Sequence, residues 1–279
     1  MKRLIKKLIP KKILKKITLF NEFTNRWKIV ADPENLGKAK NNYERFREII
    51  SDPLNLLIHR MPNAGYVNAK QEVILHNGNL VSIDINSSYY ENFADILVIN
   101  RGVHEPLEEF CFQELLSLYK TEEKKLIMLE LGAYWGHYSM WFKKKFPKAN
   151  CILVEPDKKN FETGKKNFKL NGLEAEFINE FVSSQHFTVD NFINIHSIKD
   201  IFLLHSDIQG YELEMLQNSK IALQKEIINY LMISTHSNNL HLECINEINK
   251  YNYDIDINSE PDFHSTSYDG FILARKKKL

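Results

Sequence analysis

The sequence predicts an α/β protein built on a doubly wound, mostly parallel β-sheet. From residue 126 onward, apolar strand-like runs alternate with amphipathic helix-like segments, as in folds of that class. The first run ends at an acidic residue and is followed by Gly132 and Gly136, which allow a sharp turn into a helix. The second run ends at Glu155. Together these observations predict a ligand crevice at the carboxyl edge of the sheet.

Each element of this fold has its own signal in the sequence. The apolar runs predict strands over 126–130, 151–155, 175–178, 201–206 and 230–235. The segments between and after them predict helices over 137–146, 157–171, 211–218 and 239–250. Two further runs, 253–257 and 268–274, predict an antiparallel terminal hairpin at the sheet edge.

The residues before the sheet predict an N-terminal α+β extension. Helices are expected over 42–50 and 108–119, and a short apolar run covers 95–100. Asn77-Gly78 lies between two β-rich runs over 72–84, the pattern of a tight hairpin. We therefore divide the chain into a basic amphipathic helix (1–20), the extension (21–107) and the main domain (108–279).

The basic helix contrasts with the rest of the chain. Residues 1–20 contain eight Lys or Arg and no acid. The whole chain has a net charge of +1, so residues 21–279 have a net charge of −7. Apolar pairs spaced four and five apart share one helical face, which predicts peripheral contact with an anionic membrane; packing on the body or on a partner protein is the alternative.

Composition also limits the location of the protein. Three widely spaced cysteines without a CxxC motif indicate a reducing compartment and no zinc site, so we expect no metal-binding residues. The longest apolar runs fall well short of the ~18 residues that a membrane span needs. We therefore expect a cytoplasmic protein, with any membrane contact at the inner face of the cytoplasmic membrane.

The turn after the first strand predicts the cofactor. Its glycines do not form GxGxxG, which closes around a pyrophosphate, and Glu130 occupies the place where a phosphate would approach. A carboxylate there favours a cation, and the cationic nucleoside without phosphate is S-adenosylmethionine. Glu155 ends the next strand, where an acid accepts hydrogen bonds from ribose hydroxyls.

Catalytic candidates lie at the ends of the fourth and fifth strands. Asp207 is placed to orient a substrate hydroxyl or accept its proton, although a helix cap is the alternative. His236 has an ordinary pKa of about 6.5 that suits a general base. His205 shares the strand face of Asp207 and either positions the site or simply packs.

These segments together resemble the FkbM-type methyltransferases of the class I S-adenosylmethionine-dependent group. The resemblance includes Glu105-Pro106, the 130–139 turn, 154–156, 182–184, 188–192 and 206–212. It implies a Rossmann-like methyltransferase sheet and O-methylation of a sugar, glycan or other small-molecule hydroxyl, as in capsule or lipopolysaccharide synthesis. It also implies this set of cofactor-binding residues: Glu105, Glu130, Gly132, Tyr134, Gly136, Ser139, Glu155, Pro156, Val182 and Asp207.

The chain departs from this family at three positions. The family usually has Lys at His205 and acids at Gln209 and Thr235, so the general base stays open. Only Asp207 is then available to Mg²⁺, which prefers carboxylate oxygens, so we do not favour a metal. Two other functions stay open: a nucleic-acid methyltransferase, which the acidic body disfavours, and a non-catalytic membrane scaffold.

Overall fold

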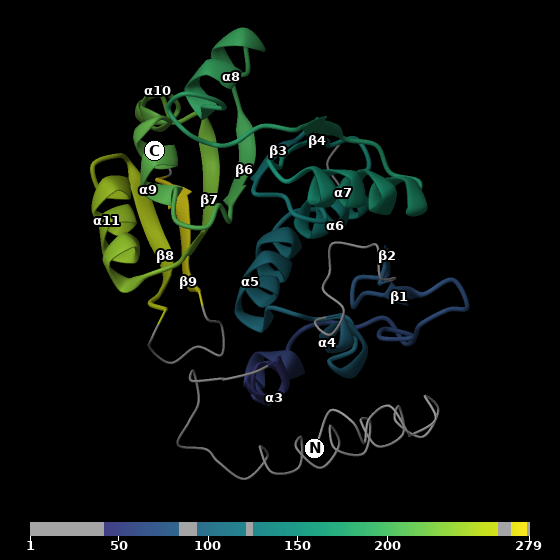
Figure 1. Cartoon of the computed structure of the whole chain (residues 1–279). Coiled ribbons are helices and arrows are strands. Elements are labelled where there is room, and N and C mark those ends of the chain that lie inside the picture. The colour runs from purple at the N-terminus through teal and green to yellow at the C-terminus, as the bar shows by residue number, and fades with distance from the viewer. Residues whose placement is uncertain (1–41, 84–93, 121–124, 262–268, 278–279) are drawn as a thin grey trace, which may run out of the picture.

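The computed structural model describes residues 42–83, 94–120, 125–261 and 269–277, which fold around a seven-stranded sheet (Figure 1). The strand order is β5-β4-β3-β6-β7-β9-β8. Strands β3 to β7 pair in parallel, whereas β9 runs antiparallel to both β7 and β8. The strands are β3 (Ile127–Leu131), β4 (Asn150–Val154), β5 (Glu176–Ile178), β6 (Ile201–Ser206), β7 (Ile228–Thr235), β8 (Tyr253–Ser259) and β9 (Gly270–Lys276).

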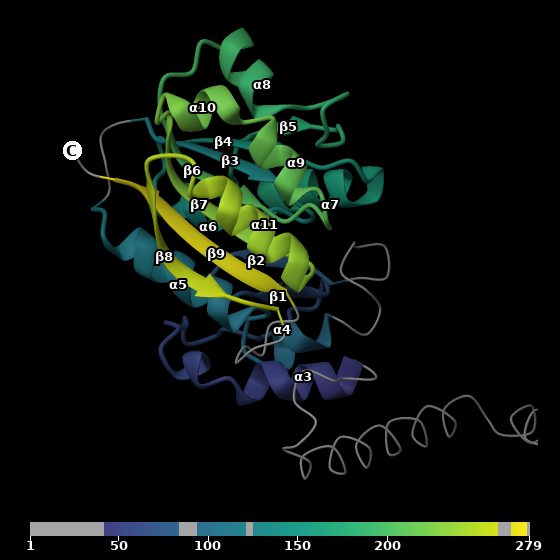
Figure 2. The same cartoon turned by 90° about the vertical axis from the view of Figure 1, so that its left-hand side faces the viewer.

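Helices cover both faces of the sheet. One core contains Met128 and side chains of the three helices between residues 106 and 170. The other core contains Leu129, Leu131 and side chains of the four helices between residues 189 and 248. Figure 2 looks onto α9, α10 and α11 in front of the sheet. The helices are α5 (Pro106–Ser117), α6 (His137–Lys145), α7 (Lys158–Leu170), α8 (Val189–Ile195), α9 (Glu212–Gln217), α10 (Lys220–Gln224) and α11 (Asn238–Ile248).

The N-terminal extension packs against the face of α5, α6 and α7. Val73 and Leu75 of its hairpin are buried in the same core as Phe112 of α5. Asn171, after α7, exchanges two side-chain hydrogen bonds of 2.8 and 2.7 Å with the backbone of Leu80. The elements of the extension are α3 (Asn42–Ser51), a 3₁₀ helix (Pro53–Leu56), β1 (Glu72–Ile74), β2 (Leu80–Ser82) and α4 (Asp95–Ile99).

The predicted fold class is confirmed: a mostly parallel Rossmann-like sheet with an antiparallel terminal hairpin and a small α+β extension. The expected strands and helices agree with the observed ones to within about two residues at either end. Three helices, α4, α8 and α10, were not expected. The boundary between extension and domain stays a prediction.

The basic segment 1–20 lies outside the described residues. Within the part of the chain that the structure describes, no helix has both the length and the apolar character needed to cross a membrane.

Candidate functional site

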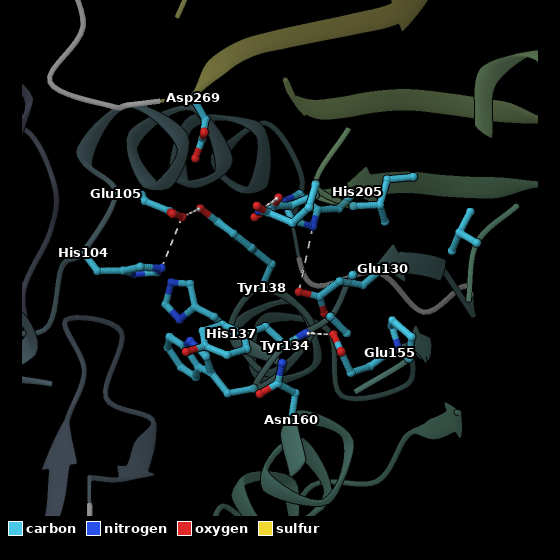
Figure 3. A pocket seen from close by; sticks show the side chains of 18 of the residues that line it. His104, Glu105, Glu130, Tyr134, His137, Tyr138, Glu155, Asn160, His205 and Asp269 are labelled. Atoms are coloured by element: carbon cyan, nitrogen blue, oxygen red, sulfur yellow. Dashed lines mark hydrogen bonds and ion pairs between the residues drawn. The ribbon is translucent and has the colours of Figure 1, made fainter. Parts of the chain in front are cut away.

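A cavity of about 560 Å³ opens at the carboxyl ends of the parallel strands (Figure 3). It lies beside β3, which pairs with β4 on one side and β6 on the other. Ligands of doubly wound sheets bind at this reversal of strand order. Most of the predicted site residues line the cavity: Glu105, Glu130, Gly132, Tyr134, Glu155, Pro156, Val182, His205 and Asp207.

Two predicted cofactor residues, Gly136 and Ser139, do not line the cavity. They belong to the turn and helix start after β3 (residues 130–139, called the cofactor turn below). Gly136 is the N-cap of α6 and has φ +81°, a left-handed conformation that favours glycine. The backbone N–H of Ser139 donates a 3.0 Å hydrogen bond to Oε2 of Glu130. Burial raises the pKa of Glu130, which is 2% exposed. Helix α6 and strand β3 are thereby joined at the base of the turn.

Gly132 brings the cofactor turn against the turn after β6. Its φ is +71°, and a Cβ at this position would lie 1.8 Å from the backbone oxygen of Asp207. The N–H of Asp207 in turn donates a 3.0 Å hydrogen bond to the carbonyl of Leu131. The two segments that the sequence singled out are therefore in direct contact, and only a glycine fits between them.

Glu155 is held at the far end of the cavity by backbone donors. Its Oε2 accepts from Tyr134 N–H at 2.8 Å and its Oε1 accepts from Asp157 N–H at 2.9 Å. Burial raises the pKa of Glu155, while these two hydrogen bonds oppose the rise. The side chain of Asn160 also bonds Glu155. A carboxylate has about four acceptor sites, so acceptor capacity still remains for a diol such as that of ribose.

Asp207 and Asp269 also line the cavity, and Figure 3 shows Asp269 on the side away from Glu155. His236 lies just behind the cavity lining, with Nε2 3.1 Å from Asp207 and 3.8 Å from Asp269, and Nδ1 3.1 Å from Glu212. Burial opposes protonation of His236, but its contacts with Asp207 and Glu212 outweigh burial and raise its pKa to about 10. At neutral pH it is therefore an imidazolium without a lone pair to accept a proton.

His205 is buried in the cavity wall beside Glu130 and Tyr138. Its Nδ1 is 3.9 Å from Oε1 of Glu130, and its ring centroid is 4.5 Å from that of Tyr138. Burial lowers the pKa of His205, so the ring is neutral at neutral pH. Both ring nitrogens lack a hydrogen-bond partner among the described residues. The ring therefore offers one donor and one acceptor to a bound ligand.

Glu105 faces Tyr138 across the upper part of the cavity. Its Oε2 accepts a 3.3 Å hydrogen bond from the Tyr138 hydroxyl and is 3.1 Å from Nε2 of His104. Burial disfavours the ionised carboxylate, but His104 outweighs burial and lowers the pKa of Glu105 to about 2. Glu105 is therefore a fixed negative charge at this end of the cavity.

Sequence reasoning missed several residues of the cavity wall. Asp269 directly precedes β9, and burial raises its pKa to about 6. Arg45 enters from α3, His104 from the loop before α5, and His137 from the first position of α6. Asp269 had a usable signal, because an antiparallel last strand must begin at the edge where the parallel strands end.

Two groups of described side chains have the composition of a metal site: Asp207 with Glu212 and His236, and His76 with Glu109 and His137. In the first group both carboxylates already face the His236 ring. Oε1 of Glu212 also accepts a 3.0 Å hydrogen bond from Ile208 N–H. A cation there would compete with an internal one. The expectation about Mg²⁺ stays a prediction.

Comparison with known proteins supplies a family. The methyltransferase FkbM domain family matches residues 72–255. No curated protein matches the chain.

Solved structures are similar at low identity. TrmK of M. capricolum in complex with S-adenosylhomocysteine has 18% identity and a TM-score of 0.43, over 61% of this chain and 69% of that one. A SAM-dependent methyltransferase from Agrobacterium tumefaciens has 15% identity and a TM-score of 0.45, over 78% and 72%. The bifunctional kinase-methyltransferase WbdD has 12% identity and a TM-score of 0.41, over 60% and 39%.

Proposed function

We propose that this chain, which belongs to the FkbM methyltransferase family, is an O-methyltransferase that acts on a hydroxyl group of a sugar or glycan, or of another small molecule. When bound, S-adenosylmethionine supplies the methyl group as part of a sulfonium cation. The observation that carries the proposal is the polarity of the cavity. A ribose-type carboxylate, Glu155, lies at one end, and an acid–base group of Asp207, His236 and Asp269 lies at the other.

The cavity has the size and charge for this cofactor. A volume of about 560 Å³ falls within the range of roughly 300–1,000 Å³ that small-molecule sites occupy. Carboxylates face it from several elements, and a negative lining stabilises a sulfonium cation. The carboxylates that line it are Glu105, Glu130, Glu155, Asp207 and Asp269.

The acid–base group can orient a hydroxyl and remove its proton. Asp207 is held by the Gln209 amide at 3.0 Å and by His236 at 3.1 Å, so its position is fixed. Asp269, with a pKa of about 6, is mostly ionised at neutral pH and close to the optimum for a general base. We therefore assign orientation of the acceptor hydroxyl to Asp207 and proton removal to Asp269.

This assignment gives His236 a different role from the general base expected from the sequence. As an imidazolium between the two aspartates, it holds both carboxylates in place. Positioning within about half an ångström matters, since misplacement by 1 Å can cost about 100-fold in rate.

Methyl transfer from labelled S-adenosylmethionine to a panel of glycans, phenols and nucleic acids tests the proposal. Asp207→Asn and Asp269→Asn should each lower kcat by about 100-fold or more. Their cofactor affinity, measured by calorimetry, should fall far less than kcat, because the remaining carboxylates of the cavity still face the sulfonium. Asp200→Asn is the matched control, because Asp200 is exposed and bonds only Asn229 among the contacts described here.

Each outcome decides between the functions. Wild-type turnover in both cavity variants refutes the acid–base assignment. Transfer to nucleic acid and not to glycans supports the nucleic-acid alternative. Cofactor binding without transfer to any acceptor supports a non-catalytic scaffold, and absence of cofactor binding refutes the proposal as a whole.

Membrane contact through residues 1–20 is a separate proposal that rests on their eight basic residues. The full chain should float with anionic liposomes, and a chain lacking residues 1–20 should not. Equal flotation of both forms would refute this contact.

A further inference from the structure

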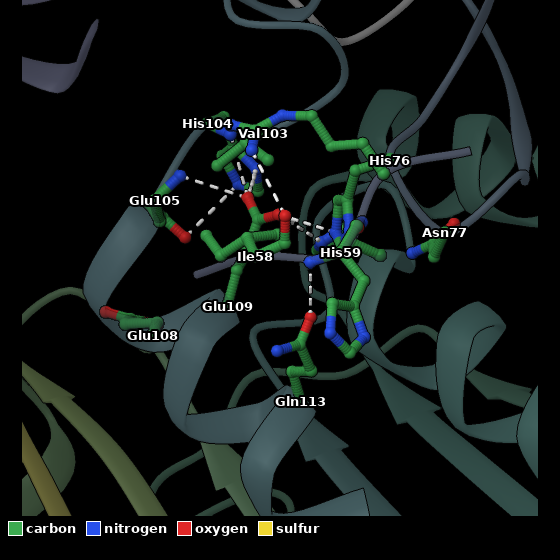
Figure 4. A network of polar contacts seen from close by, with 12 residues as sticks. Ile58, His59, His76, Asn77, Val103, His104, Glu105, Glu108, Glu109 and Gln113 are labelled. Atoms are coloured by element: carbon green, nitrogen blue, oxygen red, sulfur yellow. Dashed lines mark hydrogen bonds and ion pairs between the residues drawn. The ribbon is translucent and has the colours of Figure 1, made fainter. Parts of the chain in front are cut away.

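A buried polar cluster lies behind the cavity wall, where the extension meets the main domain (Figure 4). It consists of His76 in the turn between β1 and β2, Glu109 on α5, and His137 at the start of α6. Their side chains are 1%, 0% and 4% exposed, respectively. Glu109 also contacts a third buried imidazole, because Nδ1 of His104 lies 2.7 Å from its Oε1. Burial of these imidazoles around one carboxylate needs an explanation, since such groups rarely lose contact with water without partners.

Three atoms of this cluster face one another. Oε2 of Glu109 is 2.7 Å from Nε2 of His76 and 3.6 Å from Nε2 of His137. The three atoms lie within 4.8 Å of one another. Among the described residues these atoms contact one another as ion pairs, and no backbone group or other side chain bonds them. Buried polar atoms nearly always have a partner, so three that converge on one point indicate a shared one.

The outer atoms of His76 and Glu109 are held in place, whereas Nδ1 of His137 has no hydrogen-bond partner among the described residues. Nδ1 of His76 is 3.3 Å from the carbonyl oxygen of His59, which selects the tautomer with its Nε2 lone pair directed inward. Oε1 of Glu109 accepts the backbone N–H groups of His104 at 2.8 Å and Glu105 at 3.0 Å. Metal-binding histidines and carboxylates typically have such outer partners.

We propose that His76, Glu109 and His137 bind a divalent transition-metal ion, with Zn²⁺ as the preferred ion. Two imidazole nitrogens and one carboxylate oxygen suit Zn²⁺ and related ions, whereas Mg²⁺ and Ca²⁺ prefer oxygen alone. Zinc bonds of about 2.0–2.1 Å in a tetrahedral site place ligand atoms roughly 3.3 Å apart. The separations of 2.7 and 3.6 Å bracket this value. This proposal departs from the sequence expectation of no zinc site, which considered cysteine spacing and not a histidine–carboxylate set.

The position of the cluster assigns the ion a structural role. It would connect the hairpin turn of the extension to α5 and to the first residue of α6. His137 directly follows Gly136 of the cofactor turn and also lines the cavity. Bound metal would therefore fix the cavity wall without taking part in methyl transfer. The inference does not depend on which acceptor the protein methylates.

The metal content of the full-length protein, purified without a histidine tag or chelator, tests this site. We expect about one equivalent of zinc per chain by inductively coupled plasma mass spectrometry. His137→Ala and His76→Ala should lower the content at least about ten-fold. His196→Ala is the control, because His196 is exposed. His236→Ala distinguishes this site from the Asp207 cluster and should retain the metal.

A second measurement, on wild-type protein, tests the site even if the variants fail to fold. Wild-type protein stripped with chelator should bind Zn²⁺ with a rise of several degrees in Tm. It should also bind Co²⁺ with the visible absorption of a nitrogen- and oxygen-ligated ion. A stripped wild-type protein that binds neither ion refutes the site. Loss of metal in His236→Ala but not in His137→Ala refutes it as well.

Discussion

Replacing Gly132 by alanine tests whether contact between the cofactor turn and the Asp207 turn builds the site. The added Cβ would lie 1.8 Å from the backbone oxygen of Asp207, whereas real Cβ contacts essentially never fall below 3.0 Å. The two backbone segments must therefore separate by about 1 Å or more. The overlap is with the backbone carbonyl of Asp207. Rotation of a side chain therefore cannot relieve it.

The expected loss of stability in Gly132→Ala is the sum of two contributions. Alanine at φ +71° costs about 1 kcal/mol because of its left-handed conformation. Separation of the turns also weakens the 3.0 Å hydrogen bond from Asp207 N–H to Leu131, and an unsatisfied buried backbone group costs about 1–3 kcal/mol. We expect the free energy of unfolding to fall by about 3 kcal/mol. Cofactor affinity should fall at least about ten-fold, because the cavity wall moves by about 1 Å.

Gly172→Ala is the matched control for this experiment. Gly172 has φ +64°, but nothing lies within 4 Å of a Cβ added there. It should therefore show only the conformational cost of about 1 kcal/mol and bind the cofactor normally. Chemical denaturation and calorimetry measure the two quantities. If Gly132→Ala and Gly172→Ala unfold alike and bind alike, contact between the turns does not build the site.

Three further predictions concern charged groups of the cavity. Glu155→Gln should weaken S-adenosylmethionine binding about ten-fold in calorimetry through loss of a charge-assisted hydrogen bond, and Glu162→Gln, at an exposed position of α7, should not. Activity should rise with pH through about 6 as Asp269 ionises, and a pH–rate profile without this rise would contradict its role as base. The raised pKa of His236 stabilises the fold fully below about 6.5, and this contribution disappears as pH rises towards about 10. The Tm difference between wild type and His236→Gln should therefore shrink over that range in thermal scans, and a constant difference would contradict the ion pairs.

The sheet could be predicted because its physical signal is local. Strands buried on both faces need continuous apolar runs, and residues 127–131, 150–154 and 201–206 contain them. Helix α10 has 5 residues and α8 has 7, so neither is long enough to repeat a helical pattern clearly. Their helical form depends on packing against the second core, to which Phe192 and Leu223 belong.

The cofactor end of the site was also local in sequence. The ends of the predicted strands indicated Glu130, Gly132 and Glu155 as site residues, and all three line the cavity. The acceptor end depends on long-range geometry. Asp269 and Arg45 come from the last hairpin and the first described helix, and only the fold brings them to the cavity. The pKa of His236, after β7, likewise depends on Asp207 and Glu212 after β6, and only the parallel pairing of these strands brings them together.

The buried cluster of His76, Glu109 and His137 extends this reasoning, because its members have no motif spacing in the sequence. Each lies at the boundary of a different element, and the orientation of each is set by a backbone contact or a helix start. Metal binding and methyl transfer should consequently separate in the variants. Asp269→Asn should retain zinc and lose transfer, whereas His137→Ala should lose zinc and weaken cofactor binding through the adjoining turn. A His137→Ala protein that lacks zinc yet binds the cofactor as tightly as the wild type would show that the cluster does not support the cavity wall.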